Sequence, residues 1–282
     1  MLDKDTKEKI IEAVRIKPRT VHELSKIVEK NWRTADRYIN TIATETGLIA
    51  SRTFREGSRG ALKVVYWNAL DTTKGSVYQE RLLQKIISGR KKEDFSPFDI
   101  YQFVDKTKRE SFLEETEFSV QPKIKSDKLI LGAEKQILFF SGNLSWMELG
   151  PNMHNVLEEC AKKKIKIKVL TRVDITSQKN TEKMLALNAR FGSDIVEVRH
   201  CEQPLRAMII DDSLATIKEV LSHEFVREIK KKMFLFYLIK DPEWITWLQK
   251  VFYHLWTQSI DAKERMDALK SVQVTFKKNK IS

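Results

Sequence analysis

The stretch that decides the fold is TVHELSKIVEKNWRTADRYINTIATETGLI, residues 20 to 49. Thr20 with Glu23 three residues later is the capping-box pattern that starts a helix. A short break at Lys30 and Asn31 separates this helix from a second one, which Gly47 ends. Apolar side chains at helical spacing in the second helix and just beyond it are expected to face inward: Ala35, Tyr38, Ile39, Ile42 and Leu48. The stretch therefore predicts two helices joined by a tight turn.

The segments on either side complete a small domain. An amphipathic helix is expected over residues 6 to 16, and Pro18 ends it. The segment SRTFREGSRGALKVVYWNA, residues 51 to 69, predicts a β-hairpin whose tip is at residues 56 to 60. Helix, helix-turn-helix and hairpin in this order indicate a winged helix-turn-helix, which we expect over residues 1–68.

The rest of the chain predicts a helical linker over residues 69–127 and an α/β domain over residues 128–272. In the α/β domain, short apolar strands alternate with amphipathic helices, which is typical of an α/β sandwich and makes the whole chain α+β. One long helix is expected to begin at Asp241 and Pro242, and its tryptophan-rich stripe covers either the sheet or a partner subunit. Residues 273–282 are expected to form a loose basic tail. The expected strands are 137–142, 165–171, 195–200, 206–211, 214–219 and 233–240, with other helices over 151–163, 178–191 and 222–230.

Composition narrows the class of protein. The 282 residues carry a formal net charge of +12, which favours a polyanionic partner such as nucleic acid. Cys160 and Cys201 lie far apart, without a CxxC pattern or a metal-binding spacing, so we expect a reducing, cytoplasmic setting and neither metal nor cofactor. The sequence also lacks a signal-peptide pattern and any apolar run of about 18 residues, so no membrane span is expected.

Basic side chains gather on the two elements that touch DNA in a winged helix-turn-helix. Arginine suits guanine edges, asparagine suits adenine, and threonine suits phosphate or a thymine methyl group. Trp32 is expected either to lie against sugar and phosphate or to pack at the helix start. The alternatives are a helical bundle with a solvated basic face and a winged helix used for protein contacts. The candidate contacts with double-stranded DNA are Asn31, Trp32, Arg33, Thr34, Arg37, Arg52, Arg55, Arg59 and Lys63.

A second candidate site lies in HCEQPLRAMIIDD, residues 200 to 212. This segment resembles the His-x-Lys-x4-Asp motif of phospholipase-D-type phosphodiesterases, but Pro204 stands where the nucleophilic histidine is required. His200 is four residues early, which is about 13 Å along a strand. No catalytic residue is therefore expected. Arg206 can bind an anion or an effector, or pair with a carboxylate, and Asp211 either pairs with Arg206 or caps the following turn.

The whole pattern resembles the TrmB family of archaeal transcriptional regulators. The resemblance lies in the helix-turn-helix, in the segments ILFFSG to KIKVLT and LRAMIIDDSLATI, and in YLIKDPEWITWLQKVFYHLWTQSI with Phe252 and Trp256. It implies a winged helix-turn-helix joined through a helical linker to a phospholipase-D-like domain without catalytic function. Sugar-sensing members carry a further C-terminal ligand domain of β character, which we do not expect here, and the breaks in the linker differ from a continuous coiled coil.

The leading hypothesis is a cytoplasmic, nucleoid-associated DNA-binding regulator that acts as a homodimer, with a small-molecule effector left open. Two-fold symmetric half-sites would roughly double what one winged helix recognises. The rival hypothesis is a phospholipase-D-type nuclease targeted to DNA by the winged helix, which needs His200 near Arg206. A third hypothesis is a winged-helix protein that assembles with other proteins.

Overall fold

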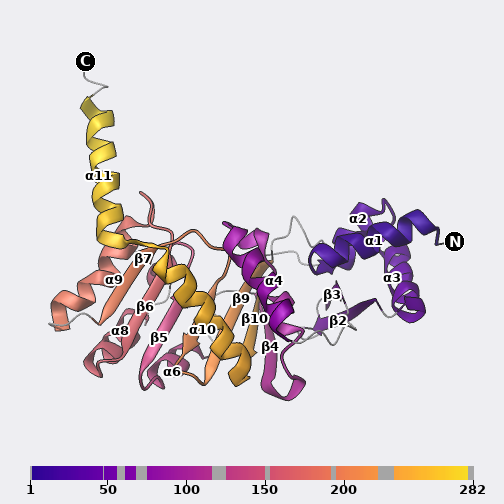
Figure 1. The fold of residues 1–282 in the computed structure, drawn as a ribbon, viewed down its shortest axis with the longest axis horizontal. Helices are drawn as coiled ribbons and strands as arrows, with labels where there is room; N and C mark the ends of the chain where they lie inside the picture. The colour runs from indigo at the N-terminus through magenta and orange to yellow at the C-terminus, as the bar shows by residue number, and fades with distance from the viewer. Residues whose placement is uncertain are drawn as a thin grey trace.

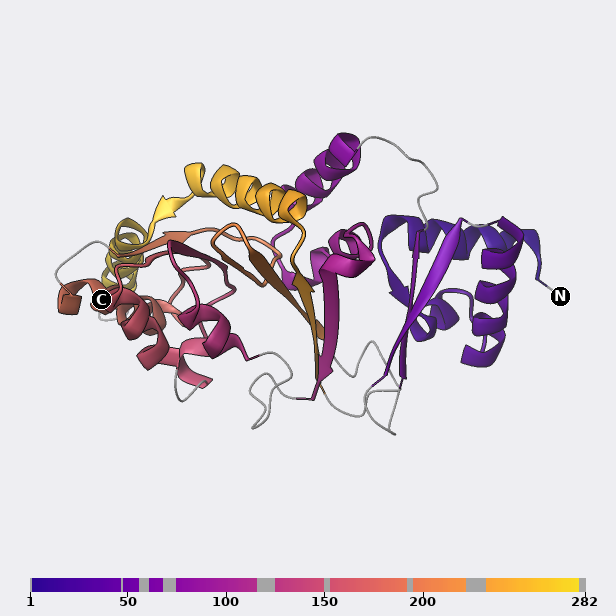
Figure 2. The same ribbon diagram turned by 90° about the horizontal axis from the view of Figure 1, so that it is seen from below.

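The chain folds into a small N-terminal unit and a larger α/β domain. The computed structural model describes residues 2–46, 48–55, 61–67, 75–115, 125–149, 153–191, 195–221 and 232–278. The molecule is elongated, with the N-terminal unit at one end and α9 (Gln178–Phe191) and α11 (Ala262–Lys278) at the other (Figures 1 and 2). The α/β class and the winged helix-turn-helix order of elements are confirmed.

The N-terminal unit has the predicted arrangement. The capping box is present, since the Thr20 hydroxyl accepts from the Glu23 amide at 3.1 Å and the Glu23 carboxylate accepts from the Thr20 amide at 2.7 Å. Ala35, Tyr38, Ile39 and Ile42 are buried, whereas Leu48 is only half-buried. The strands form a small sheet in the order β1-β3-β2. The elements are α1 (Lys4–Ile16), β1 (Arg19–Thr20), α2 (Val21–Ile27), α3 (Trp32–Thr46), β2 (Ile49–Arg55) and β3 (Ala61–Trp67).

The larger domain is built on one sheet of eight strands in the order β11-β7-β6-β5-β8-β9-β10-β4. Strands β5, β6 and β7 are parallel, and every other neighbouring pair is antiparallel. The parallel strands are joined by helical crossovers, as parallel neighbours require. The strands are β4 (Arg109–Glu114), β5 (Gln136–Phe140), β6 (Lys166–Thr171), β7 (Val196–His200), β8 (Ala207–Ile210), β9 (Leu214–Leu221), β10 (Met233–Ile239) and β11 (Ile260–Asp261).

Helices cover both faces of this sheet, so that two apolar cores form. One core lies between the sheet and α6 (Ser126–Leu131), α7 (Trp146–Leu149), α8 (Met153–Lys162), α9 and the start of α11. The other core lies between the sheet and α4 (Gly75–Ser88), α5 (Phe98–Tyr101) and α10 (Pro242–Thr257). The tryptophan-rich stripe of α10 is buried in this second core, so it covers the sheet of its own chain.

Three expectations need correction. The segment 69–127 is not helical throughout, because Arg109–Glu114 forms β4 and pairs with β10 as the edge strand of the large sheet. The helix expected from Asp241 onward is broken, because Ile260 and Asp261 pair with β7. The segment expected to be a loose tail is helical as far as Lys278, since α11 includes it.

Two short 3-10 turns, Lys92–Asp94 and Lys106–Lys108, flank α5. The expected helix 222–230 lies outside the described residues.

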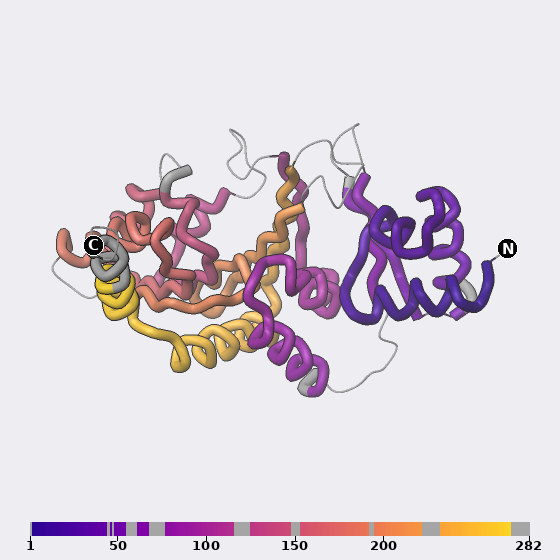
Figure 3. The backbone as a smooth tube through the Cα atoms, turned by 90° about the horizontal axis from the view of Figure 1, so that it is seen from above, coloured from indigo at the N-terminus to yellow at the C-terminus, as the bar shows by residue number. Residues whose placement is uncertain are grey.

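The β2–β3 hairpin joins the two parts of the molecule. Val65 on one face of the hairpin packs in the core of the N-terminal unit. On the other face, Phe54 and Leu62 pack in the same core as α5 and the large sheet. The Phe54 and Phe98 rings are 6.1 Å apart between centroids, and the N-terminal unit lies beside β4 and α5 (Figure 3). The hairpin thus belongs to two cores at once.

Candidate functional site

The first turns of α3 carry a solvent-exposed group of polar and cationic side chains. The Asn31 side-chain oxygen accepts from the Thr34 amide at 2.9 Å and so caps the helix. Trp32 is 53% exposed, and the Arg33 guanidinium lies 5.6 Å from the centre of its indole. Arg33 and Arg37 are both exposed and one helical turn apart, which places them on one stripe. The opposite stripe of α3 is buried in the core, so the helix presents its cations outward.

The other predicted DNA contacts have different surroundings. The Lys63 ammonium bonds Asp36 at 2.7 Å and Asn40 at 2.9 Å, so it ties β3 to α3. The Arg52 guanidinium lies 5.5 Å from the Phe54 ring and 5.2 Å from the Tyr101 ring. Because Tyr101 belongs to α5, Arg52 faces the larger domain, and we assign it to the junction between the two parts. The Arg55 side chain and the whole of Arg59 lie outside the described residues.

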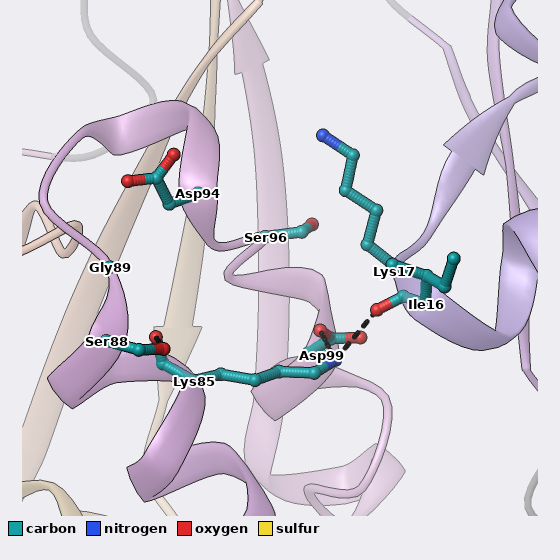
Figure 4. Close-up of a pocket in the computed structure, with 8 residues that line it drawn as sticks. All are labelled: Ile16, Lys17, Lys85, Ser88, Gly89, Asp94, Ser96 and Asp99. Atoms are coloured by element: carbon teal, nitrogen blue, oxygen red, sulfur yellow. Dashed lines mark hydrogen bonds and ion pairs between the residues drawn. The ribbon is translucent and has the colours of Figure 1, made fainter.

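A cleft of about 230 Å³ lies between the N-terminal unit and α4–α5 (Figure 4). Lys85 crosses it, and its ammonium donates to the Ile16 carbonyl at 2.9 Å and to the Asp99 carboxylate at 3.1 Å. Burial raises the pKa of Asp99, although the Lys85 charge opposes this shift. The Lys17 ammonium points into the same cleft. Lys85 therefore fastens the end of α1 to the larger domain.

Asp211, the acidic residue of the degenerate motif, has a structural role. Its carboxylate accepts three backbone N–H groups, from Glu134 at 2.9 Å, Lys135 at 2.9 Å and Gln136 at 2.8 Å. Its own backbone has a φ of 48°, in the left-handed region that aspartate tolerates better than most residues. The expectation that Asp211 pairs with Arg206 is wrong, because the carboxylate holds the start of β5 instead.

Arg206 lies immediately before β8 with a largely buried guanidinium. Its Nη1 group donates to the backbone carbonyls of Gln203 at 3.2 Å and Leu205 at 2.7 Å. Burial, together with the neighbouring charge of Arg172, lowers the pKa of Arg206 to about 10. No carboxylate oxygen among the described residues lies within 4.0 Å of this guanidinium. Within the described residues, the Arg206 guanidinium therefore bonds only to backbone carbonyls.

His200 is too far from Arg206 to act with it. His200 ends β7, and strands β6 and β5 lie between β7 and β8. Three strand spacings amount to about 14 Å. The His200 Nδ1 atom already accepts from the Val173 amide at 2.9 Å, and burial lowers the pKa of this imidazole. Within the described residues, the geometry does not bring a histidine and Arg206 together as a phosphodiesterase requires.

Several residues of these sites were missed from the sequence. Gly142, Arg172 and Gln203 surround Arg206, and Lys85 and Asp99 hold the junction. The glycine that ends the apolar stretch ILFFSG was a usable signal, because such a glycine often permits close approach of another group. No local sequence pattern marks Arg172, Gln203, Lys85 or Asp99.

The residues that the structure describes include no group of three or more His, Cys, Asp or Glu side chains placed to hold a metal ion. Over the same ranges, no helix is both long and apolar enough to cross a membrane.

Fold and surface together define a winged helix joined by its hairpin to a three-layer α/β domain with a mixed sheet. No family model and no curated protein matches the chain. Among solved structures the chain is similar to TrmBL2, an archaeal chromatin protein described with a novel mode of DNA binding. The two are 12% identical, and the TM-score is 0.41. The similarity covers 91% of this chain and 93% of that one.

Two further similarities cover about half of this chain. NucT from Helicobacter pylori is 11% identical over 54% of this chain and 99% of its own, with a TM-score of 0.38. The phospholipase D family member Nuc from Salmonella typhimurium is 13% identical over 54% of this chain and 97% of its own, with a TM-score of 0.36.

Proposed function

We propose that the chain binds double-stranded DNA through the exposed stripe of α3. The observation that carries this proposal is that Arg33 and Arg37 lie in solvent on one stripe, while the opposite stripe of the same helix is buried. A helix held in this way can enter the major groove with its first turns against base edges and phosphates. The predicted contacts are narrowed to Asn31, Trp32, Arg33, Thr34 and Arg37, with Arg55 and Arg59 of the hairpin as further candidates.

The role of the protein is proposed as transcriptional regulation without catalysis. Pro204 stands at the position of the nucleophile that a phospholipase-D-type mechanism needs, and His200 lies about 14 Å from the strand that carries Arg206. The protein acts as a cytoplasmic homodimer that stays with the nucleoid, because two copies of a winged helix recognise a longer operator than one. Archaeal origin is part of the same proposal.

The proposal is tested with the double variant Arg33→Gln, Arg37→Gln in fluorescence-anisotropy titrations of a labelled duplex. Loss of two phosphate contacts lowers the slope of log affinity against log salt by about 1.8. Arg190→Gln is the matched control, because it removes one exposed arginine from α9 at the far end of the molecule (Figure 1). Equal binding and equal slopes for wild type, the double variant and the control would remove α3 from the DNA-binding surface.

The nuclease alternative makes an opposite prediction. Metal-independent cleavage of duplex DNA that disappears in His200→Ala would support it, whereas intact duplex after prolonged incubation supports the regulator. Absence of duplex binding at about 100 mM salt would instead favour a protein-assembly role for the winged helix.

A further inference from the structure

The guanidinium of Arg206 is a buried cation without a carboxylate partner among the described residues. Its Nη1 group is committed to two backbone carbonyls, which carry only partial charges. Among the described residues, the carboxylate that acts on it electrostatically is that of Glu93, whose oxygen lies 3.7 Å from the Lys92 ammonium. A buried charge without a counter-charge costs free energy, because water no longer solvates it. An anion bound beside Arg206 would remove that cost.

A second arginine approaches the same point in the fold. The Arg172 amide donates to the Gly142 carbonyl at 3.0 Å, and its Nε group bonds one oxygen of Asp174 at 2.8 Å. The other Asp174 oxygen already accepts from Thr176 and Ser177, so this carboxylate is fully occupied. Arg172 lowers the pKa of Arg206, as expected of two like charges close together. One carboxylate does not balance both cations.

Gly142 makes room for this arrangement. A Cβ atom at Gly142 would lie 2.6, 2.7 and 2.8 Å from the Nη2, Nε and Cζ atoms of Arg206. Real Cβ atoms do not approach that closely, so the guanidinium lies over the backbone only because this position is glycine. Residue 142 follows β5, and Arg172 follows β6. Both lie at the carboxyl ends of parallel strands, where open α/β sheets bind their ligands.

Two buried polar side chains at this edge also lack hydrogen-bond partners. Gln203 is 2% exposed; its amide donates to the Ser141 carbonyl at 3.0 Å, and its Oε1 atom has no partner among the described residues. The hydroxyl of Thr171, which is 0% exposed, has none in the described chain either. Unsatisfied buried polar atoms are uncommon in folded proteins and mark places where a ligand or water completes the bonding.

We infer that Arg206 and Arg172 bind a phosphate-type oxyanion near Gly142, at the carboxyl edge of β5 and β6. Guanidinium groups match the geometry of phosphate oxygens. Among the described residues only Asp174 contacts either arginine, and Glu93 bonds Lys92, so two closely placed cations suit an anion that carries more than one negative charge. The site binds without reacting, because Pro204 supplies no nucleophile. It is independent of DNA binding by α3, and the phosphate can belong either to a small molecule or to the backbone of a nucleic acid.

The first experiment uses the full chain without DNA and inorganic phosphate as the probe. Thermal unfolding is compared in phosphate, on the order of 10 mM, and in chloride of equal ionic strength. If phosphate is well above its Kd, the wild-type Tm rises by about 2–4 °C or more. Arg172→Gln loses most of this rise and still folds, because the Arg172 side chain is half-exposed and its backbone bond to Gly142 remains. Arg206→Gln also loses the phosphate-dependent rise in Tm, whereas the control Arg190→Gln keeps it.

Two results would overturn the inference: no phosphate-specific rise in the wild type, or an undiminished rise in Arg172→Gln. As a readout that does not depend on stability, the Nε–H resonances of Arg172 and Arg206 shift in nitrogen-15 spectra on addition of phosphate. Resonances that stay fixed would contradict binding even if the Tm rises.

A second experiment, with duplex DNA, distinguishes a small phosphorylated molecule from a nucleic-acid backbone as the source of the phosphate. If the site takes a small phosphorylated molecule, Arg172→Gln and Arg206→Gln bind duplex with the wild-type salt slope. If the site takes a backbone phosphate, each variant lowers the slope by about 0.9 and free phosphate competes with the duplex. Failure of α3 to bind DNA would leave the first experiment unaffected, so the two proposals fail separately.

Discussion

The α3 surface and the carboxyl edge of β5 and β6 both carry arginines, but they hold them in opposite ways. Arg33 and Arg37 stand in water, where a charge costs little and is screened by salt. Arg206 is buried against backbone carbonyls, where an uncompensated charge costs free energy and salt screens it poorly. An exposed pair suits a long, repetitive polyanion, whereas a buried group suits one small anion. The two proposals therefore assign the same residue type to two kinds of recognition in one chain.

The largest expected effect comes from weakening the junction between the N-terminal unit and the larger domain. Phe98 is 2% exposed, and its ring lies 6.1 Å from Phe54, 4.9 Å from Tyr66 and 6.2 Å from Tyr237 between centroids. Phe98→Ala is expected to lower the free energy of unfolding by about 3–5 kcal/mol, because the hairpin loses its main contact with the larger domain. Urea denaturation followed by fluorescence and circular dichroism should then show two transitions. Phe191→Ala at the far end of α9 is the control and should leave a single transition. One unchanged transition in Phe98→Ala would mean that the hairpin does not couple the domains.

A smaller effect is expected from removing Asp211, and it tests whether this carboxylate holds the start of β5. Asp211→Ala removes a carboxylate that accepts three backbone N–H groups, and it places alanine at a φ of 48°. The expected loss in free energy of unfolding is roughly 2–3 kcal/mol, since hydrogen bonds to a charged group are lost and the N–H groups return to water. Asp212→Ala, at the exposed neighbour, should cost less than about 1 kcal/mol. Equal losses for the two variants would show that Asp211 has no special structural role.

The smallest effect concerns the junction cleft and depends on pH. Burial raises the folded-state pKa of Asp99 above its ordinary value of 3.8. The folded protein therefore holds this proton more tightly than the unfolded chain, and ionised Asp99 costs stability as pH rises above that value. Asp99→Asn has no such proton, so its stability relative to wild type should increase as pH rises through this interval.

Asp105→Asn is expected to change the pH dependence of stability in the opposite direction. Hydrogen bonds from Thr107 lower the pKa of Asp105, so its contribution is present above the ordinary value of 3.8 and is lost as pH falls. Relative to wild type, this variant should therefore become less stable as pH rises. Denaturation midpoints at a series of pH values give both differences, and parallel curves for the two variants would contradict the assignment at Asp99.

Local patterns predicted much of the fold. The capping box at Thr20, the helix over residues 178–191 and the helix start at Asp241 and Pro242 appear as expected, because caps and helical periodicity act within one or two turns. β4 was taken for part of a linker, because its pairing with β10 joins residues more than 100 positions apart. Of the proposed site, the α3 side chains could be named in advance, whereas the surroundings of Arg52, Lys63 and Arg206 could not.

The sequence by itself determined the order of elements, the basic character of α3 and the presence of proline at position 204, because each depends on residue type and near neighbours. Only the tertiary structure decided what the charged groups do. Asp211 holds backbone 75 to 77 residues away, the hairpin shares its second face with the larger domain, and Arg206 lies over Gly142 with Arg172 beside it. These roles depend on contacts between distant segments, and such contacts exist only after the sheet has brought the strands together.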